Sequence, residues 1–166
     1  MILKGRVWKF GDSISTDDIT PGRFFHLRSN LPELAKHTLE DVREDFAKNV
    51  KKNDIIVAGK NFGLGSSREH AARVFKVLGV SCIVAKSFAR IFFRNCINIG
   101  MPLIELKEVD EINDGDIIEI DLKNGILNNS NTAKSYNFVK LPAFILNIVQ
   151  TSGIEEMIKK YSKIIS

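Results

Sequence analysis

The chain has few of the residues that build disulfides and metal sites. Its 166 residues include 2 cysteines, 3 histidines, 4 prolines and 1 tryptophan. Cys82 and Cys96 lie in apolar segments without C-x-x-C spacing, so we expect buried free thiols in a reducing compartment. His26, His37 and His70 lack the spacing of metal ligands. The sequence therefore predicts that this chain binds no metal or cofactor itself.

Long hydrophobic runs are also missing. No apolar run approaches the roughly 18 residues of a membrane-spanning helix, and no apolar stretch behind a basic start indicates a signal peptide. We therefore expect a cytoplasmic protein with no membrane contact. The net charge is only +4, and aromatic residues are not interleaved with the basic ones as a nucleic-acid surface needs. A nucleic-acid partner is not expected, whereas an anionic substrate is compatible with this charge.

Short apolar runs alternate with amphipathic segments in the middle of the chain. Residues 54–58, 80–85 and 101–105 are typical of buried strands. Residues 67–78 and 87–97 between them have helical spacing, and Ser87 is expected to cap the second helix. This order predicts an α/β fold: one domain over residues 1–166, with a mostly parallel core sheet flanked by helices and some antiparallel additions. The other expected elements are strands at 3–10, 116–122 and 137–141 and helices at 31–37, 39–47, 142–149 and 154–161.

The most informative segment is residues 59–71, Gly-Lys-Asn-Phe-Gly-Leu-Gly-Ser-Ser-Arg-Glu-His-Ala. Two glycines permit a tight turn just before a predicted helix. Ser66 and Glu69 have the spacing of a capping box, a helix N-terminus attracts anions, and Arg68 offers a planar fork for a carboxylate. An ordinary capped helix is the simpler explanation of Ser-x-x-Glu alone. The two adjacent hydroxyls and the arginine favour a carboxylate-binding helix N-terminus, with a serine able to handle a proton.

Other sites that contain glycine and serine do not fit this segment. It lacks the Gly-Lys-Ser/Thr ending of a phosphate-binding loop, the third glycine of a dinucleotide fingerprint and the G-x-S-x-G of a hydrolase elbow. A helix macrodipole contributes about 0.3–1 kcal/mol, or ~2 when partly buried, and one pKa unit is about 1.4 kcal/mol. The helix alone therefore cannot ionise Ser66. Further donors, cations and an electrophile from outside this chain are needed.

Three stretches together carry a family resemblance. They are residues 9–23 (Lys-Phe-Gly-Asp-Ser-Ile-Ser-Thr-Asp-Asp-Ile-Thr-Pro-Gly-Arg), residues 61–71, and residues 85–95 (Ala-Lys-Ser-Phe-Ala-Arg-Ile-Phe-Phe-Arg-Asn). In this order the chain resembles the small subunits of isopropylmalate isomerase and homoaconitase, which are similar to the swivelling C-terminal domain of aconitases. The resemblance covers most of residues 1–106, and residues 107–166 carry no motif that we can use.

The resemblance implies a swivelling-type β/β/α domain that closes over a large subunit, and that partner would hold a [4Fe–4S] cluster. Ser66 would be the base that takes the proton α to a carboxylate, while Ser67 and Arg68 would bind substrate carboxylate. Asp17 would orient the serine motif, although Asp clusters before a proline also form plain turns. The implied reaction is a hydro-lyase isomerisation of 2- and 3-isopropylmalate in leucine biosynthesis, active only with the large subunit.

The substrate is left open by the loop at residues 24–30, Phe-Phe-His-Leu-Arg-Ser-Asn. The resemblance implies that this loop contacts the substituent that differs between substrates, which are small 2-hydroxy di- or tricarboxylic acids. Arg28 would suit the distal carboxylate of homoaconitate, whereas the loop's Phe and Leu side chains would suit the isopropyl group. The alternatives are therefore a homoaconitase or methylmalate-type small subunit, or a non-catalytic aconitase-like binding protein. A homodimer of the isolated chain is plausible because its docking face would be bare.

Overall fold

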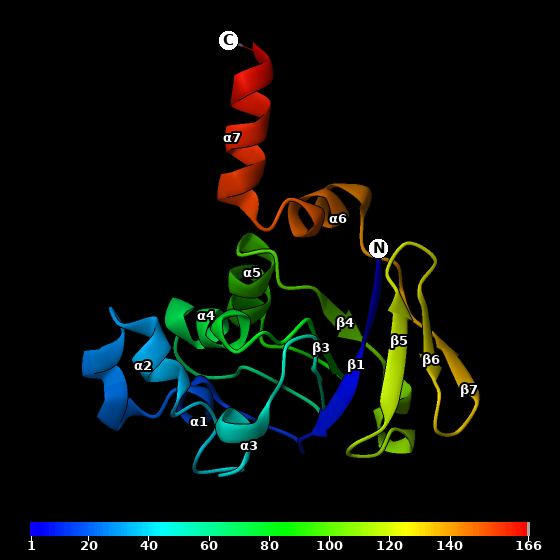
Figure 1. Ribbon diagram of the computed structural model, residues 1–166, viewed down its shortest axis with the longest axis horizontal. Coiled ribbons are helices and arrows are strands. Elements are labelled where there is room, and N and C mark those ends of the chain that lie inside the picture. Colours follow the sequence, from blue (N-terminus) through cyan, green and yellow to red (C-terminus); the bar gives the residue numbers. More distant parts are fainter. Residues whose placement is uncertain (166) are drawn as a thin grey trace.

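The strands form a seven-stranded sheet, and the computed structural model describes residues 1–165. The strand order is β4-β3-β2-β1-β5-β6-β7 (Figure 1). β1, β2, β3 and β4 run parallel, and β5, β6 and β7 extend the sheet antiparallel from β1. The bounds are β1 Ile2–Lys9, β2 Ile55–Ala58, β3 Cys82–Ala85, β4 Leu103–Glu105, β5 Ile117–Asp121, β6 Ile126–Asn129 and β7 Lys134–Asn137.

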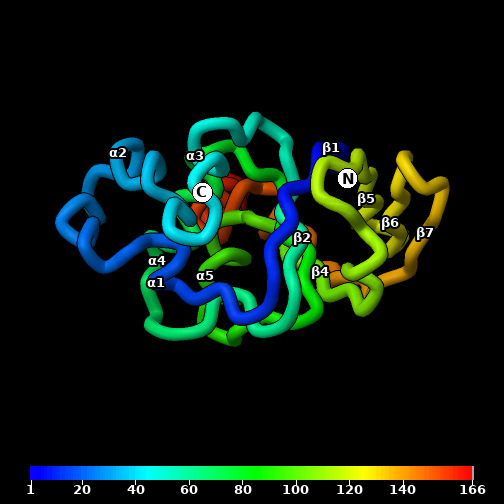
Figure 2. Tube along the Cα trace, turned by 90° about the horizontal axis from the view of Figure 1, so that it is seen from below, coloured from blue at the N-terminus to red at the C-terminus, as the bar shows by residue number. Residues whose placement is uncertain are grey.

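The helices lie mainly around the parallel half of the sheet. Figure 2 shows β5, β6 and β7 at one end of the molecule and α2 at the other. The bounds are α1 Thr16–Ile19, α2 Leu31–Ala35, α3 Phe46–Asn49, α4 Glu69–Val77, α5 Arg90–Asn98, α6 Ala143–Gln150 and α7 Ile154–Ile165, with 3₁₀-helices η1 Gly22–Leu27 and η2 Lys107–Glu111. None of the helices within residues 1–165 has the length and hydrophobicity needed to cross a membrane.

Both faces of the parallel half are buried, which explains the continuous apolar runs. Ile56 and Ala58 of β2 pack in a cluster with Trp8. The same cluster includes a phenylalanine from each of three helices: Phe46 of α3, Phe75 of α4 and Phe92 of α5. Ile55 and Val57 pack on the opposite face with residues of β5, β6 and α6. A strand covered on both faces cannot alternate apolar with polar residues. The predicted α/β class and the parallel core with antiparallel additions are confirmed.

Two predicted elements are wrong. Residues 39–47 are mostly turns, because Leu39 has a left-handed φ of 58° and donates its N–H to the Ile19 carbonyl at 3.1 Å; only α3 is helical there. The strand predicted at 137–141 lies earlier, as β7, and pairs with β6, which the sequence did not predict. The β6–β7 hairpin is polar except at Ile126 and at the paired Leu127 and Tyr136, so it lacks a continuous apolar run.

A buried hydroxyl gives a first prediction about stability. Thr38 is fully buried, and its Oγ1 has no hydrogen-bond partner within residues 1–165. Leaving a buried hydroxyl unpaired costs about 1–3 kcal/mol. Thr38→Val is therefore expected to raise the free energy of unfolding by about 1 kcal/mol, measured by urea denaturation. Thr20→Val is the matched control, because the buried Thr20 Oγ1 donates to the Thr16 carbonyl at 3.2 Å, and it should lower stability. Equal losses in both variants would contradict this explanation.

Candidate functional site

Two loops that are far apart in the sequence meet at the carboxyl ends of β1 and β2. These strands are parallel neighbours, so the loops that follow them leave the sheet at the same edge. Backbone hydrogen bonds join them: Ser13 N donates to Lys60 O at 2.7 Å, Gly63 N to Ile14 O at 2.7 Å, and Thr16 N to Leu64 O at 2.8 Å. In open α/β sheets, ligands bind at such an edge.

Two glycines shape the second loop. Gly63 and Gly65 have φ of 82° and 108°, in the region that side chains disfavour. A Cβ on Gly63 would lie 2.2 Å from Phe92 Cγ, and a Cβ on Gly65 would lie 3.1 Å from Thr16 Oγ1. The loop therefore approaches α1 closely, and Ser66 Oγ lies 3.3 Å from Thr16 Oγ1. Thr16 is a site residue that sequence reasoning did not single out, because the partner hydroxyls are 50 residues apart.

The predicted capping box at Ser66 and Glu69 is wrong. Helix α4 begins at Glu69, and its N-cap is Arg68, whose φ of −75° and ψ of 104° are extended. The Glu69 carboxylate accepts from Arg73 Nη2 at 2.8 Å, so it is directed along the helix and not back toward Ser66. No side chain caps this helix N-terminus within the described residues. Ser66 and Ser67 are consequently exposed beside an uncapped helix end, which suits an anion.

The expected N-cap at Ser87 is also wrong. Helix α5 begins at Arg90 with Ala89 as its N-cap. Ser87 Oγ instead accepts from Asn61 N at 2.9 Å, and Ser87 O accepts from Phe62 N at 3.0 Å. Residues 85–95, the third stretch of the family resemblance, thus hold the start of the loop that carries Ser66.

A capping box is present at α1. Ser15 Oγ accepts from Asp18 N at 3.0 Å, and Ser15 N donates to Asp18 Oδ2 at 2.8 Å. The Ser-x-x-Asp spacing was visible in the sequence, within the stretch at 9–23, although the expected acidic partner in such a box is Glu. This box fixes the start of α1 and with it Thr16, which faces Ser66, and Asp17.

The carboxylate of Asp17 holds Arg68 in place. Arg68 Nη1 donates to Asp17 Oδ1 at 3.1 Å and to Thr20 O at 2.9 Å, and Asp17 Oδ1 also accepts from Gly22 N at 2.9 Å. An exposed ion pair of this kind is worth only about 0.2–1 kcal/mol. Its effect is to orient the guanidinium. Both hydrogen bonds use Nη1, and Nη2 makes none within residues 1–165, so the Nη2 side of the fork is available to a carboxylate.

Arg28 lies on a neighbouring part of the same surface. Its guanidinium lies 4.2 Å from the centre of the Phe25 ring, and Nη1 donates to Phe25 O at 3.2 Å. Phe25 in turn contacts His70 of α4 edge-on, with ring centres 5.8 Å apart. Burial lowers the pKa of His70, and the positive charges of Arg68 and Arg28 lower it further. The two arginines thus lie within electrostatic reach of the same imidazole, and their charge favours an anionic ligand.

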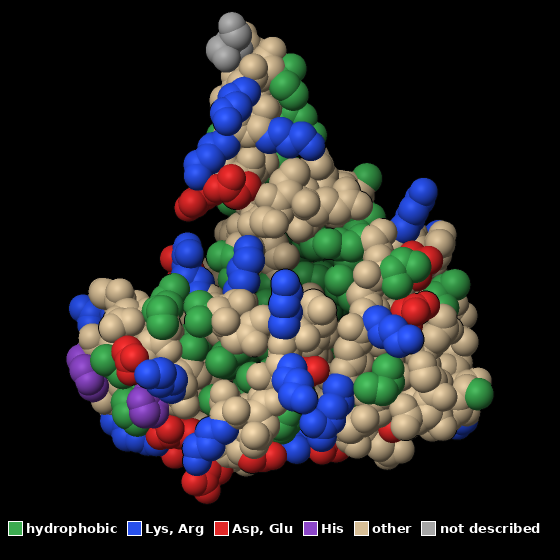
Figure 3. Space-filling model, viewed as in Figure 1, with side chains coloured by type: hydrophobic (Ala, Val, Ile, Leu, Met, Phe, Trp, Pro, Cys, Tyr) green, Lys and Arg blue, Asp and Glu red, His purple; other side chains and the backbone are tan. Residues whose placement is uncertain are grey.

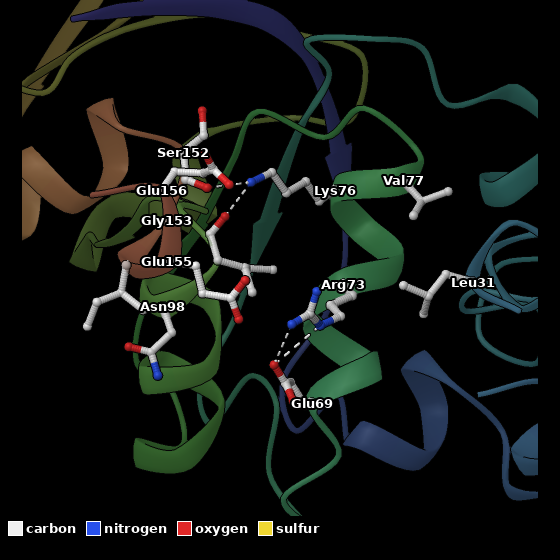
Figure 4. A pocket seen from close by; sticks show the side chains of 12 residues that line it. Leu31, Glu69, Arg73, Lys76, Val77, Asn98, Ser152, Gly153, Glu155 and Glu156 are labelled. Carbon is white, nitrogen blue, oxygen red and sulfur yellow. Dashed lines mark hydrogen bonds and ion pairs between the residues drawn. The ribbon is translucent and has the colours of Figure 1, made fainter. Parts of the chain in front are cut away.

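A cavity lies elsewhere on the molecule. It has a volume of about 620 Å³ and lies between α4, the end of α5 and the start of α7 (Figure 4). Glu69 and Arg73 pair on one wall, and Lys76 Nζ donates to Ser152 O at 3.0 Å across it. Ser66 and Arg68 do not line it. Ser66 and Ser67 are exposed, so a second surface is needed to enclose a substrate there.

The donor groups of this chain do not fit an iron–sulfur cluster. Such clusters take cysteine thiolates, but Cys82 in β3 and Cys96 in α5 are fully buried, and burial raises the pKa of both thiols. Within residues 1–165 no three His, Cys, Asp or Glu side chains gather as a metal site requires.

Comparisons with known proteins agree on one family. The profile of the aconitase C-terminal domain matches residues 16–109. The chain is 69% identical over 160 residues to 3-isopropylmalate dehydratase small subunit 1 of Thermotoga maritima, covering 96% of each chain. It is 51% identical over 164 residues to small subunit 2 of the same enzyme from Archaeoglobus fulgidus, covering 99% of each. The crystal structure of 3-isopropylmalate dehydratase from Methanocaldococcus jannaschii superposes with a TM-score of 0.91 at 43% identity, covering 99% of this chain and 97% of that one.

Proposed function

The chain belongs to the aconitase C-terminal domain family, among the small subunits of 3-isopropylmalate dehydratase, and from this membership we propose that it supplies the proton-handling serine of that hydro-lyase. The resemblance predicted from residues 9–23, 61–71 and 85–95 is confirmed. One observation carries the proposal for the site: the loops after β1 and β2 bring Ser66 to Thr16 and Arg68 to Asp17. We also propose that residues 1–166 act as one domain, which the shared sheet from Ile2 to Asn137 supports.

The partner follows from the family. A small subunit has a large subunit, and aconitase relatives work with a [4Fe–4S] cluster, which supplies an electrophile for the substrate's hydroxyl and carboxylate. We assign the cluster to the large subunit, because both cysteines of this chain are buried. The exposure of Ser66 and Ser67 supports docking of that subunit over this edge of the sheet. The isolated chain would then be inactive.

The residues of this chain would bind one carboxylate and move one proton. The open side of the Arg68 fork, the Ser67 hydroxyl and the uncapped α4 N-terminus hold the carboxylate. Ser66 Oγ, as the alkoxide, takes the proton from the carbon α to that carboxylate and becomes a neutral hydroxyl, which returns the proton when water adds back. The Thr16 hydroxyl, 3.3 Å away, can donate to the Ser66 alkoxide before the proton is taken. Asp17 acts through Arg68, as a positioning residue.

The substrate proposed is isopropylmalate, with leucine biosynthesis as the pathway. The names of the relatives support it, and the Phe25 and Leu27 side chains are compatible with an isopropyl group. Arg28 keeps homocitrate as the second candidate, because its charge lies within reach of His70 and Arg68. A hydrogen bond to a charged group is worth about 1.5–3 kcal/mol, so an Arg28 that bound a distal carboxylate would contribute roughly 10–150-fold.

The test compares both substrates with the enzyme reconstituted from this chain and a cluster-loaded large subunit. We expect isopropylmalate turnover, with kcat/KM for Arg28→Val within about threefold of wild type, because an apolar arm offers no second carboxylate. Arg23→Val is the matched control: Arg23 lies in η1, the 3₁₀-helix that Arg28 directly follows, but it pairs with Glu40 and Asp41. Turnover of homocitrate, lost in Arg28→Val and kept in Arg23→Val, would replace the proposal by homoaconitase.

A further inference from the structure

The loops that follow β1 and β2 first meet just beyond the ends of these strands, in a contact that we call the Asp12 junction. Two of its hydrogen bonds join backbone atoms: Gly59 N donates to Gly11 O at 3.0 Å, and Ser13 N donates to Lys60 O at 2.7 Å. The third uses a side chain, because Asp12 Oδ1 accepts from Lys60 N at 2.8 Å. The carboxylate of one loop thus holds the backbone of the other.

Glycine at position 59 leaves the space that this carboxylate occupies. Gly59 is buried, and a Cβ there would lie 1.8 Å from Asp12 Oδ1 and 2.9 Å from Asp12 Cγ. Gly59 does not have a left-handed φ, so its backbone conformation alone does not require glycine. The requirement comes from close packing against the carboxylate. The Asp12 side chain is therefore part of how the two loops fit together.

Each loop makes a left-handed turn directly after the junction. Ser13 has a φ of 58° and Asn61 has a φ of 56°, and neither is a glycine. This region is sterically disfavoured for residues with a Cβ, although asparagine tolerates it better than most. Such conformations persist where surrounding contacts hold them. The hydrogen bond between Asp12 and Lys60 is placed to do this, because it joins the two residues that precede these turns.

Beyond the junction the two loops stay side by side as far as Ser66. Gly63 N donates to Ile14 O at 2.7 Å, Thr16 N donates to Leu64 O at 2.8 Å, and the Thr16 hydroxyl then lies 3.3 Å from Ser66 Oγ. These contacts follow the junction in order along both loops. The position of Ser66 therefore depends on how the loops meet at the junction, and a misplacement of about 1 Å can slow a reaction about 100-fold.

Acidic and basic side chains lie next to one another along the lower edge of the molecule in Figure 3, the edge at which β1 ends in Figure 1. Lys86, directly after β3, lies within reach of two carboxylates. Its hydrogen bond to Asp110 Oδ2 at 2.5 Å raises the pKa of Lys86, and the negative charge of Asp12 raises it further. Within residues 1–165 Asp12 forms no ion pair, whereas Asp110 pairs with Lys86 and bonds neither loop. Asp110 is therefore a matched control for the charge of Asp12.

From these contacts we infer that Asp12 is a positioning residue for Ser66, and that it acts by holding the two left-handed turns where the loops meet. The inference rests on the proposed function, in which Ser66 is the base. Asp12 itself lies outside the site, because within residues 1–165 it makes no hydrogen bond to Ser66, Thr16 or Arg68. Its carboxylate sets where one loop lies against the other.

The first test measures the enzyme reconstituted with Asp12→Ala. We expect kcat to fall about 10–100-fold, because Ser66 is displaced from the hydrogen that it abstracts. The kinetic isotope effect from deuterium at that carbon should rise, since only the proton step is slowed, whereas a loss of folded enzyme would leave it unchanged. Asp12→Asn keeps an Oδ1 acceptor for Lys60 N and should recover most of kcat. Asp110→Ala should leave kcat and the isotope effect at their wild-type values.

The outcomes separate this inference from the proposed function. If Ser66→Ala abolishes α-hydrogen exchange but Asp12→Ala keeps the wild-type kcat and isotope effect, the inference alone fails. Full exchange in Ser66→Ala would overturn both. An Asp12→Ala chain that does not fold would assign the carboxylate to the stability of the domain and overturn the inference. Amide hydrogen exchange of Lys60 needs no activity: it should be slow in the wild type and in Asp12→Asn, and fast exchange in the wild type would contradict the junction.

The second test removes the strain in the backbone. Glycine adopts a left-handed φ without steric cost, so Ser13→Gly should recover part of the kcat lost in Asp12→Ala. Ala133→Gly is the matched control, because Ala133 has a φ of 56° in the turn between β6 and β7. It relieves the same kind of strain and should recover no activity. If Ser13→Gly recovers nothing, or if both glycines recover kcat equally, the carboxylate does not act through the turn and the inference is wrong.

Discussion

Ser66→Ala is expected to lower kcat of the reconstituted enzyme by about 10²–10⁴-fold, the usual contribution of a positioned general base. The loss should fall on kcat, because the carboxylate contacts of Arg68 and Ser67 stay in place and KM should change little. Ser66 is exposed, and its Oγ lies 3.3 Å from the Thr16 hydroxyl, so removing Oγ should not affect folding. A specific readout is the exchange of the substrate's α-hydrogen with deuterated water, which should stop in this variant.

Two variants separate proton handling from a merely structural role. Ser130→Ala changes an exposed serine in the turn between β6 and β7 and should leave kcat unchanged. Thr16→Val removes the hydroxyl beside Ser66 Oγ and should give a smaller loss than Ser66→Ala, about tenfold for one hydrogen bond near 1.4 kcal/mol. Binding of the large subunit is measured for every variant by calorimetry. Near wild-type exchange in Ser66→Ala, with the partner bound, would assign the base elsewhere.

The elements set by local hydrophobicity were predictable from the sequence. The fully apolar β2 and β3 and the amphipathic α4 and α5 alternate along the chain, and that alternation alone indicates a parallel core. The ends of the helices were not predictable in the same way. Ser66 and Ser87 have N-cap chemistry, but the chain turns between Ser66 and Arg68, where Arg68 N donates to Ser66 O at 2.9 Å, so the helix begins only after Arg68. Ser87 Oγ is engaged by Asn61 N. Tertiary contacts decided which serine caps a helix.

The site itself was predicted only in part. Ser66, Ser67 and Arg68 are contiguous, so a motif could identify them together. The pairing of Arg68 with Asp17 and of Ser66 with Thr16 depends on β1 and β2 being parallel neighbours. Spacing within a single sequence carries no information about that register. The direction of Arg28 depends likewise on an aromatic contact with Phe25, which the loop sequence permits but does not require.

Gly63→Ala is expected to be the most destabilising single substitution near the site. The alanine would need a φ of 82°, which costs a side-chain-bearing residue about 1–2 kcal/mol. Its Cβ would lie 2.2 Å from Phe92 Cγ, and such overpacking costs about 1–3 kcal/mol. The ring cannot simply turn away, because Phe92 is buried and packs edge-on against Phe62 at 5.5 Å. We expect a loss of roughly 2–5 kcal/mol in the free energy of unfolding.

Gly11→Ala is the matched control, and its expected effect has the opposite sign. A Cβ on Gly11 meets no atom within 4 Å, and this glycine does not have a left-handed φ. Alanine there should raise stability by about 0.4–1 kcal/mol by restricting the unfolded chain. Combining Gly63→Ala with Phe92→Leu separates the two costs, because the smaller side chain relieves the clash but not the strain in φ. A favourable coupling of about 0.5–3 kcal/mol is expected. Additive losses in the double variant would mean that the clash with the Phe92 ring does not contribute to the destabilisation by Gly63→Ala. The left-handed φ alone would then require glycine at this position.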